Sequence, residues 1–272
     1  MPFIKLNGAT IYYEEQGTGP ETIVFAHGLL WSGQMFDEQV RVLKARYRCI
    51  TFDFRGQGQS EVTPTGYDME TLTEDAAALM TTLECAPCHF VGLSMGGFIG
   101  MRLASRQPYL IKSLMLLETT ADPEPAETVG RYRLLSWIAR WFGLRMVADR
   151  VMPIMFGQKF LTDPARAELR CVMRERLIQN HRIGITRAVN ALIQRAGIYE
   201  EIQKIQVPTL IIVGDQDVAT VPAKSERIHA QIAGSRLVII PGAGHTATVE
   251  EPEAVNNALL AFLAEQVPST GH

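Results

Sequence analysis

The chain has 272 residues, 47% of them hydrophobic and 20% charged, and its formal net charge is −3. These values exclude a disordered or fibrous chain and predict one globular domain with an elaboration, because a chain of this length can bury a large core. No apolar run approaches the roughly 18 residues of a membrane span, the start lacks a basic region followed by an apolar run, and no dense Lys/Arg run is interleaved with aromatics. We therefore expect a cytoplasmic protein, monomeric or a small homo-oligomer, with neither membranes nor nucleic acid among its partners.

The first elements expected along the chain are a hairpin and two buried strands. Residues 3–6 and 10–14 alternate apolar and polar side chains around Asn7-Gly8, which is typical of a hairpin with one wetted face. The almost continuously apolar runs at 22–26 and 49–52 are instead typical of buried parallel strands.

Strands and helices continue to alternate further along the chain. More strands are expected at 89–91, 112–117, 209–213 and 236–240, and helices at about 36–43, 72–83, 223–232 and 252–265. This alternation predicts a mostly parallel sheet that is covered by helices on both faces.

The stretch from about Ala121 to Gln206 breaks this rhythm. It contains no convincing buried strand, but residues 132–142 and 165–179 are typical of helices. We interpret residues 121–206 as a helical cap inserted between the sixth and seventh strands of a core formed by 1–120 and 207–272. Such a cap would lie over the C-terminal edge of the sheet, where ligands bind in open α/β folds.

Charge is distributed unevenly between these two regions. Residues 121–206 carry a net charge of +5, and the remainder of the chain carries −8. The arginines of the cap could form a solvated face that pairs with the acidic body, or a basic entrance for anionic substrates.

The pentapeptide Gly92-Leu93-Ser94-Met95-Gly96 follows an apolar run and precedes a segment of small and apolar residues, so it predicts strand, sharp turn and helix. Glycines are needed where the strand and the helix approach each other. The Met95 N–H and the helix dipole would then point at any oxygen that becomes negative beside Ser94. About one chain in ten of this length contains such a pentapeptide by chance. The prediction that Ser94 is a nucleophile therefore depends on finding a base and an acid elsewhere in the sequence.

Partners of the required kind follow two later strands. A serine nucleophile needs a base, usually an imidazole, which a carboxylate orients, and in this type of fold the order is serine, acid, histidine. Asp215 and Asp217 come after the strand at 209–213, and His245 comes after the strand at 236–240. The three motifs in this order predict a catalytic triad.

With these motifs in place, the chain resembles the α/β-hydrolase superfamily over nearly its whole length. The matching segments are Phe25-Ala26-His27-Gly28-Leu29, residues 53–60, residues 92–97, and Gly214-x-x-Asp217 followed by Gly244-His245. Within the superfamily, the chain looks most like small, cofactor-free esterases and lactonases related to 3-oxoadipate enol-lactonase and the non-haem haloperoxidases. The resemblance implies an α/β-hydrolase fold: an eight-stranded, mostly parallel sheet flanked by helices, with a helical cap between strands 6 and 7.

The resemblance also implies roles for individual residues. Ser94 would be the nucleophile, His245 the general base and then acid, and Asp217 the orienting carboxylate. The backbone N–H groups of Leu29 and Met95 would form the oxyanion hole, and no metal or organic cofactor would be needed.

Several neighbouring residues have alternative interpretations. Asp215 lies two residues too early for the Gly-x-x-Asp pattern, and Glu118 stands where some family members keep their acid, so both are rival acids. His27 is expected to hold the oxyanion loop rather than to react. Asp53 and Arg55 are expected to fix the loop after their strand through a buried charged hydrogen bond.

Aromatic residues and methionines concentrate in the cap and near the oxyanion loop, where they could be ordinary core or could line an adaptable apolar pocket. We hypothesise that an acyl chain of short to medium length lies under the cap. The residues predicted to bind it are Trp31, Trp137, Trp141, Met152, Met155 and Phe156.

The favoured function is a carboxylesterase or lactonase that acts on a small-molecule ester or lactone through an acyl-enzyme. Acyl-homoserine lactones and enol-lactones are the lactone candidates: the apolar cap suits the former and the basic cap the latter. A cofactor-free perhydrolase or haloperoxidase and a carbon–carbon bond hydrolase would use the same triad. A ligand receptor that kept the fold is the non-enzymatic alternative.

The four cysteines are Cys49, Cys85, Cys88 and Cys171. Cys85 and Cys88 have the spacing of a redox pair or of half a metal site. A zinc site would need two more ligands at similar spacing, and none is present. We expect these two cysteines to lie in a turn between a helix and the strand that leads to Ser94.

Overall fold

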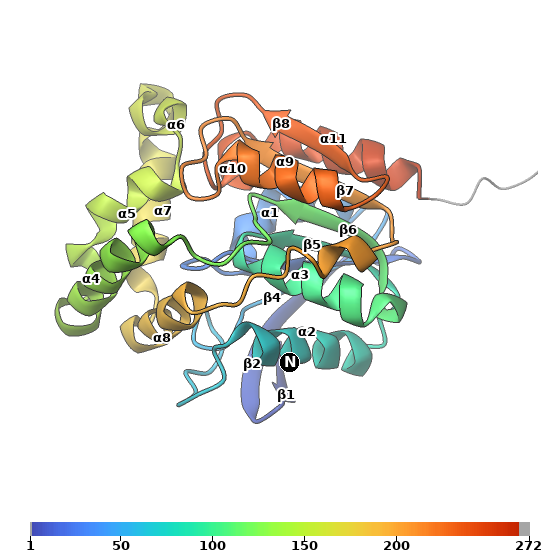
Figure 1. The fold of residues 1–272 in the computed structure, drawn as a ribbon, viewed down its shortest axis with the longest axis horizontal. Coiled ribbons are helices and arrows are strands. Elements are labelled where there is room, and N and C mark those ends of the chain that lie inside the picture. Colours follow the sequence, from blue (N-terminus) through green and yellow to red (C-terminus); the bar gives the residue numbers. More distant parts are fainter. Residues whose placement is uncertain (1, 267–272) are drawn as a thin grey trace, which may run out of the picture.

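The computed structural model describes residues 2–266 and shows a single mixed sheet with helices on both faces (Figure 1). The last residues of the predicted core segment, 267–272, lie outside the described part of the chain. The eight strands are β1 (Phe3–Leu6), β2 (Ala9–Gln16), β3 (Thr22–Ala26), β4 (Arg48–Phe52), β5 (Cys88–Leu93), β6 (Ile111–Leu117), β7 (Thr209–Gly214) and β8 (Arg236–Ile240).

The strand order is β1-β2-β4-β3-β5-β6-β7-β8. β1 and β2 form the predicted hairpin, in which Leu6 pairs with Ala9 and both Asn7 and Gly8 have positive φ, as a tight hairpin turn requires. β2 also pairs antiparallel with β4, and every remaining pair is parallel. The predicted mostly parallel, eight-stranded sheet is therefore confirmed.

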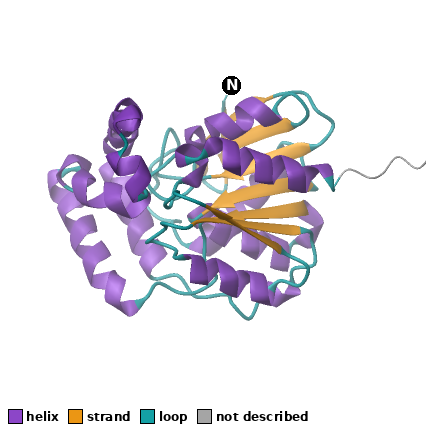
Figure 2. Cartoon of the chain, turned by 90° about the horizontal axis from the view of Figure 1, so that it is seen from above, coloured by secondary structure: helices purple, strands orange, loops and turns teal. Residues whose placement is uncertain are grey.

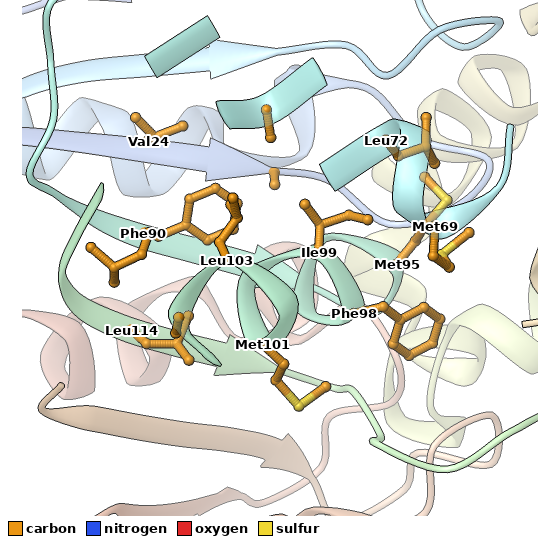
Figure 3. Packing of buried hydrophobic residues seen from close by; sticks show 14 of the residues in the cluster. Val24, Met69, Leu72, Phe90, Met95, Phe98, Ile99, Met101, Leu103 and Leu114 are labelled. Atoms are coloured by element: carbon orange, nitrogen blue, oxygen red, sulfur yellow. The ribbon is translucent and has the colours of Figure 1, made fainter. Parts of the chain in front are cut away.

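Two hydrophobic clusters lie on opposite faces of the sheet, because alternate strand residues point to opposite sides. One cluster takes Val24 and Phe90 from the strands, and the other takes Phe25 and Val91. Figure 3 shows part of the first cluster, with Val24, Phe90 and Leu114 from the sheet and Ile99 and Leu103 from the helix after Ser94. The helices of this core are α1 (Asp37–Leu43), α2 (Met69–Thr82), α3 (Met95–Arg106), α9 (Pro222–Gln231), α10 (Ala247–Glu250) and α11 (Pro252–Ala264).

Between β6 and β7 the chain forms helices and no strand. They are α4 (Ala126–Phe142), α5 (Ala148–Met155), α6 (Gln158–Thr162), α7 (Ala167–Gln179) and α8 (Arg182–Ile193), and we refer to them together as the helical insertion. Figures 1 and 2 show the insertion gathered at one side of the sheet. The expected helices at 132–142 and 165–179 correspond to α4 and α7, whereas α5, α6 and α8 were not individually expected.

Short 3₁₀ turns complete the structure, at Gly33–Phe36, Pro108–Leu110, Leu144–Met146, Pro164–Arg166 and Ile202–Lys204. Among residues 2–266, no helix is both long enough and apolar enough to cross a membrane.

Candidate active site

Ser94 occupies the sharp turn between β5 and α3. Its φ is +50° and its ψ is −108°, a strained conformation for a residue with a side chain. The Ser94 N–H donates to the Leu117 carbonyl oxygen at 2.8 Å, which ties the turn to β6. A side chain at Gly92 would collide with the backbone of Gly96, so the close approach of strand and helix requires a glycine there.

Asp217 and His245 meet although they come from loops after different strands. The distance between Asp217 Oδ2 and His245 Nδ1 is 2.8 Å, and both side chains are buried. Asp217 Oδ1 accepts hydrogen bonds from the Ala219 and Thr220 N–H groups, and Oδ2 accepts one from the Thr220 hydroxyl. Burial alone would raise the pKa of Asp217, but His245 and these hydrogen bonds outweigh it, so the pKa lies below its ordinary value. Asp217 is therefore ionised at neutral pH and holds the Nδ1–H tautomer of His245.

The two rival acids lie elsewhere. Asp215 accepts a hydrogen bond from the Gly242 N–H at 2.7 Å, so it braces the loop before His245. Glu118 is completely buried after β6, and neither of its carboxyl oxygens has a hydrogen-bond partner among the described residues. Burial, followed by the charges of Asp217 and Glu250, raises the pKa of Glu118 well above its ordinary value. Of the three carboxyl groups, only that of Asp217 contacts the imidazole.

The oxyanion loop, Gly28 to Trp31, is held by His27. His27 Nδ1 lies 2.7 Å from the Gly28 carbonyl oxygen, and the Phe54 N–H donates to Nε2 at 2.9 Å. A neutral ring protonated on Nδ1 satisfies both contacts, and burial lowers the pKa of His27 accordingly. The Leu29 and Met95 N–H groups donate no hydrogen bond to any residue in the 2–266 range. They are therefore available to an acceptor beside Ser94.

Asp53 and Arg55, which follow β4, have different hydrogen-bond partners. Asp53 accepts hydrogen bonds from the Gly33 and Gln59 N–H groups, both at 2.8 Å. Arg55 instead makes a buried bidentate ion pair with Asp75 of α2, at 2.7 and 2.8 Å.

Ser94 and His245 both border one cavity that is partly open to solvent, and no hydrogen bond joins their side chains in this structure. The wall is mainly apolar and comes from the oxyanion loop, α3, α4, α5 and α8. Besides the oxyanion loop, it includes Leu93, Phe98, Tyr132, Leu135, Ser136, Ala139, Leu144, Val147, Val151, Ile154, Met155, Ile185, Thr186, Val189, Leu192, Ala219 and Thr220.

One buried ion pair interrupts this apolar wall. Arg195 Nη1 lies 2.9 Å from Glu124 Oε2, and the guanidinium stacks 4.5 Å from the centre of the Phe98 ring. Arg195 Nε has no hydrogen-bond partner among the described residues, and the same holds for Trp31 Nε1. Glu124, Arg195 and Trp31 all border the cavity.

Comparison with known proteins assigns the chain to a family. Residues 21–252 match the family model described as the alpha/beta hydrolase fold. The chain belongs to this α/β-hydrolase family. The family predicted from the motifs is thus confirmed.

Three proteins similar to this chain illustrate the range of the family. The crystal structure of an enol-lactonase from Burkholderia xenovorans superposes with a TM-score of 0.90 at 30% identity, covering 97% of this chain and 100% of that one. A thermophilic esterase from Thermogutta terrifontis gives a TM-score of 0.89 at 26% identity, covering 97% of each chain. A candidate non-heme bromoperoxidase of Mycobacterium tuberculosis is 32% identical over 276 aligned positions, covering 93% of this chain and 97% of the relative.

In this chain, two of the six residues predicted to bind substrate border the cavity, namely Trp31 and Met155. Phe156 lies behind them, with its ring edge-on to Trp31 at 5.8 Å and stacked on Phe160 at 4.5 Å. Met152 is buried in the same cluster and does not border the cavity either.

Trp137 and Trp141 differ most from the prediction, because they are 56% and 65% exposed and point away from the cavity. The cavity face of α4 is formed by Tyr132, Leu135, Ser136 and Ala139, at helical spacing. The two tryptophans fall on the other side of the helix. The chain therefore contacts its cavity through the smaller residues of α4 and not through the two tryptophans.

The four cysteines of the chain are free thiols, three of them buried. Cys85 lies in the turn between α2 and β5, as expected, whereas Cys88 is the first residue of β5. Among residues 2–266, no group of three or more His, Cys, Asp or Glu side chains could hold a metal ion.

Proposed function

We propose that this protein is a serine hydrolase that cleaves carboxylic esters or lactones of short to medium acyl chain. The observation that carries the proposal is the buried Asp217–His245 hydrogen bond on the wall of the apolar cavity that Ser94 also borders. Membership of a hydrolase family with enol-lactonase and esterase neighbours supports it.

The reaction begins with attack of Ser94 Oγ on the carbonyl carbon. His245 Nε2 accepts the hydroxyl proton, because Nδ1 is committed to Asp217. The imidazolium that forms is stabilised by the ionised Asp217 carboxylate. The Leu29 and Met95 N–H groups donate to the developing oxyanion, each contributing about 3 kcal/mol of barrier reduction.

The same residues complete the cycle. His245 returns its proton to the leaving alkoxide, and the acyl group stays on Ser94. A water molecule then gives a proton to His245 and attacks the acyl carbon; His245 returns this proton to Ser94 Oγ as the bond between Ser94 and the acyl group breaks, which releases the carboxylic acid and restores the serine. With a lactone, the leaving alkoxide remains attached to the acyl group, and the product is a hydroxy acid.

The helical insertion would determine which acyl chains the cavity accepts. We propose to treat residues 121–206 as a cap on a core of 1–120 and 207–272, because α4, α5 and α8 supply most of the apolar wall opposite Ser94. Trp31 and Met155 are retained as substrate contacts, and Leu135, Ala139 and Val189 are added to them.

The test is a panel of p-nitrophenyl esters of increasing acyl length beside a panel of lactones that includes an enol-lactone and an acyl-homoserine lactone. Ser94→Ala should lower kcat/KM at least about 10³-fold and abolish covalent labelling by a fluorophosphonate. Ser136→Ala is the matched control, because Ser136 is also a buried serine on the cavity wall and should stay within a few-fold of the parent. Retained turnover in Ser94→Ala would refute the nucleophile. Halogenation that requires peroxide, without ester turnover, would assign a haloperoxidase instead.

A further inference from the structure

The outer side of the helical insertion carries an apolar surface. Of the twelve large hydrophobic residues that are exposed within residues 2–266, five fall in the short segment 134–146. We call these five the outer patch: Leu134 (55% exposed), Trp137 (56%), Trp141 (65%), Phe142 (62%) and Met146 (64%). Exposed aromatic side chains gathered in this way are typical of an interaction surface.

Four of the five residues of the outer patch lie on α4, and Met146 follows in the next 3₁₀ turn. Leu134, Trp137 and Trp141 follow the i, i+3, i+7 spacing of a single face of α4. The Trp137 and Phe142 rings meet edge to face at 5.8 Å. The opposite face of α4 already borders the cavity, so this helix is apolar on both sides and no described part of the chain covers the outer one. Figure 1 shows α4 at the outer margin of the insertion.

Arginines without acidic partners surround the outer patch. Arg131, Arg133 and Arg140 lie on α4, and Arg182 donates to the Trp141 carbonyl oxygen. None of these four has a carboxylate oxygen within 4.0 Å among the described residues. Glu127, in the first turn, is the one acidic residue of α4. The proposal that cap arginines pair with the acidic body does not account for these four.

This charge decides between two occupants of the patch. A second copy of the chain packed through the same patch would place these arginines against their own equivalents, which opposes association. An anionic surface would instead be attracted. Tryptophan, phenylalanine and leucine on one face with arginine at its flanks is the composition of helices that lie in the headgroup region of a bilayer.

We propose that the outer patch docks the protein peripherally on an anionic lipid bilayer. Trp137, Trp141 and Phe142 enter the headgroup region while the flanking arginines contact lipid phosphates. This departs from the expectation that membranes are not among the partners, because surface docking needs no spanning segment. Docking would place the acyl cavity about one helix diameter, roughly 10 Å, from the lipid.

The test is co-sedimentation of the full chain with phosphatidylglycerol vesicles and with phosphatidylcholine vesicles, at low and at high salt. Binding to phosphatidylglycerol that weakens with salt is expected. Tryptophan emission reports the same event, because Trp31 is buried and the other two of the three tryptophans are in the patch. Their emission should shift to shorter wavelength on binding.

Variants separate the two contributions. The pair Trp137→Ser/Trp141→Ser should weaken vesicle affinity at least about tenfold, and Arg133→Gln/Arg140→Gln should weaken it roughly fivefold per arginine and flatten the salt dependence. Tyr109→Ser is the matched control, since Tyr109 is a 72% exposed aromatic just before β6, and its affinity should equal the parent's.

Three results would overturn the proposal. The first is absence of binding to phosphatidylglycerol, and the second is equal binding to both kinds of vesicle. The third is a dimer that depends on protein concentration in sedimentation velocity and is lost in Trp137→Ser/Trp141→Ser, together with no binding to vesicles. That result would assign the outer patch to a second copy of the chain.

Discussion

The edge of the core that carries the proposed catalytic residues and the helical insertion are built in different ways. At the edge of the core, directional contacts fix each functional group: Asp217 accepts three hydrogen bonds besides its contact with His245, and the Ser94 turn is tied to β6. In the insertion, the cavity wall is mainly apolar side chains on three helices, with one buried ion pair, Glu124–Arg195, where the insertion meets the core.

We expect the core edge to determine the reaction and the helical insertion to determine which acyl chains fit the cavity. Hydrogen bonds fix atoms to within tenths of an ångström, which proton transfer requires, whereas apolar contacts set volume and tolerate substitution. The core should therefore be sensitive to the loss of single atoms, and the insertion should be sensitive to changes in side-chain size.

The largest effect is expected from a one-atom change at the core edge. Asp217→Asn cannot stabilise the imidazolium and favours the wrong tautomer of His245, so kcat should fall about 10³- to 10⁴-fold. Asp215→Asn is the matched control on the same loop and should keep activity within a few-fold, because Asp215 contacts Gly242 and not His245. Steady-state kinetics on one p-nitrophenyl ester measures both. Equal losses of kcat in the two variants would contradict the assignment of Asp217 as the carboxylate that orients His245.

The buried Glu124–Arg195 pair, whose members flank the two ends of the helical insertion, is where the loss of one charged group should matter. Arg195→Met would leave Glu124 buried and unpaired, which should lower the free energy of unfolding by about 3–5 kcal/mol. Glu124→Leu added to Arg195→Met should restore most of the loss, since no charge then remains. Urea unfolding measures the series. Arg174→Met breaks an exposed pair with Asp149 and should barely move the midpoint; a comparable loss there would contradict the distinction.

The sequence predicts the edge of the core better than it predicts the helical insertion. The Ser94 turn is encoded within five consecutive residues, and the loops with Asp217 and His245 could be placed because parallel strands all end at one edge. The Glu124–Arg195 pair has no comparable signal, because its members are 71 residues apart, on a loop and at the end of a helix that was not individually expected.

The orientation of α4 also could not be predicted. Hydrophobicity favoured Trp137 and Trp141 as cavity residues, but both sides of the helix are apolar, so the pattern does not say which side faces inward. Packing against α8 settles this in the structure, with Ala139 buried inside and Trp137 outside.

Glu118 provides a test of pH dependence at the core edge. Its pKa is raised in the folded protein, so the folded state keeps a proton that the unfolded chain releases above about 4.5. Stability should therefore fall as pH rises above that value, by up to about 1.4 kcal/mol per pH unit. Glu118→Gln has no proton to lose, and its melting temperature should exceed the parent's increasingly from pH 5 to pH 8.

The control for this series is Glu253→Gln, at an exposed carboxyl in the first turn of α11. Its melting curve against pH should run parallel to the parent's. A Glu118→Gln variant that is offset by the same amount at every pH would show that the carboxyl does not stay protonated in the fold.

The smallest effect is expected from side-chain size in α4, where two adjacent leucines, about 100° apart around the helix axis, have different surroundings. Leu135 borders the cavity and Leu134 is 55% exposed. Leu135→Trp should reduce the space for the acyl chain and lower kcat/KM for an octanoyl ester about tenfold relative to an acetyl ester. Leu134→Trp makes the same substitution one residue away and should leave that ratio unchanged. If both variants change the octanoyl-to-acetyl ratio equally, α4 affects the cavity through its overall position and not through its inner face. That result would contradict the distinction between an inner face that selects the acyl chain and an outer face that docks on lipid.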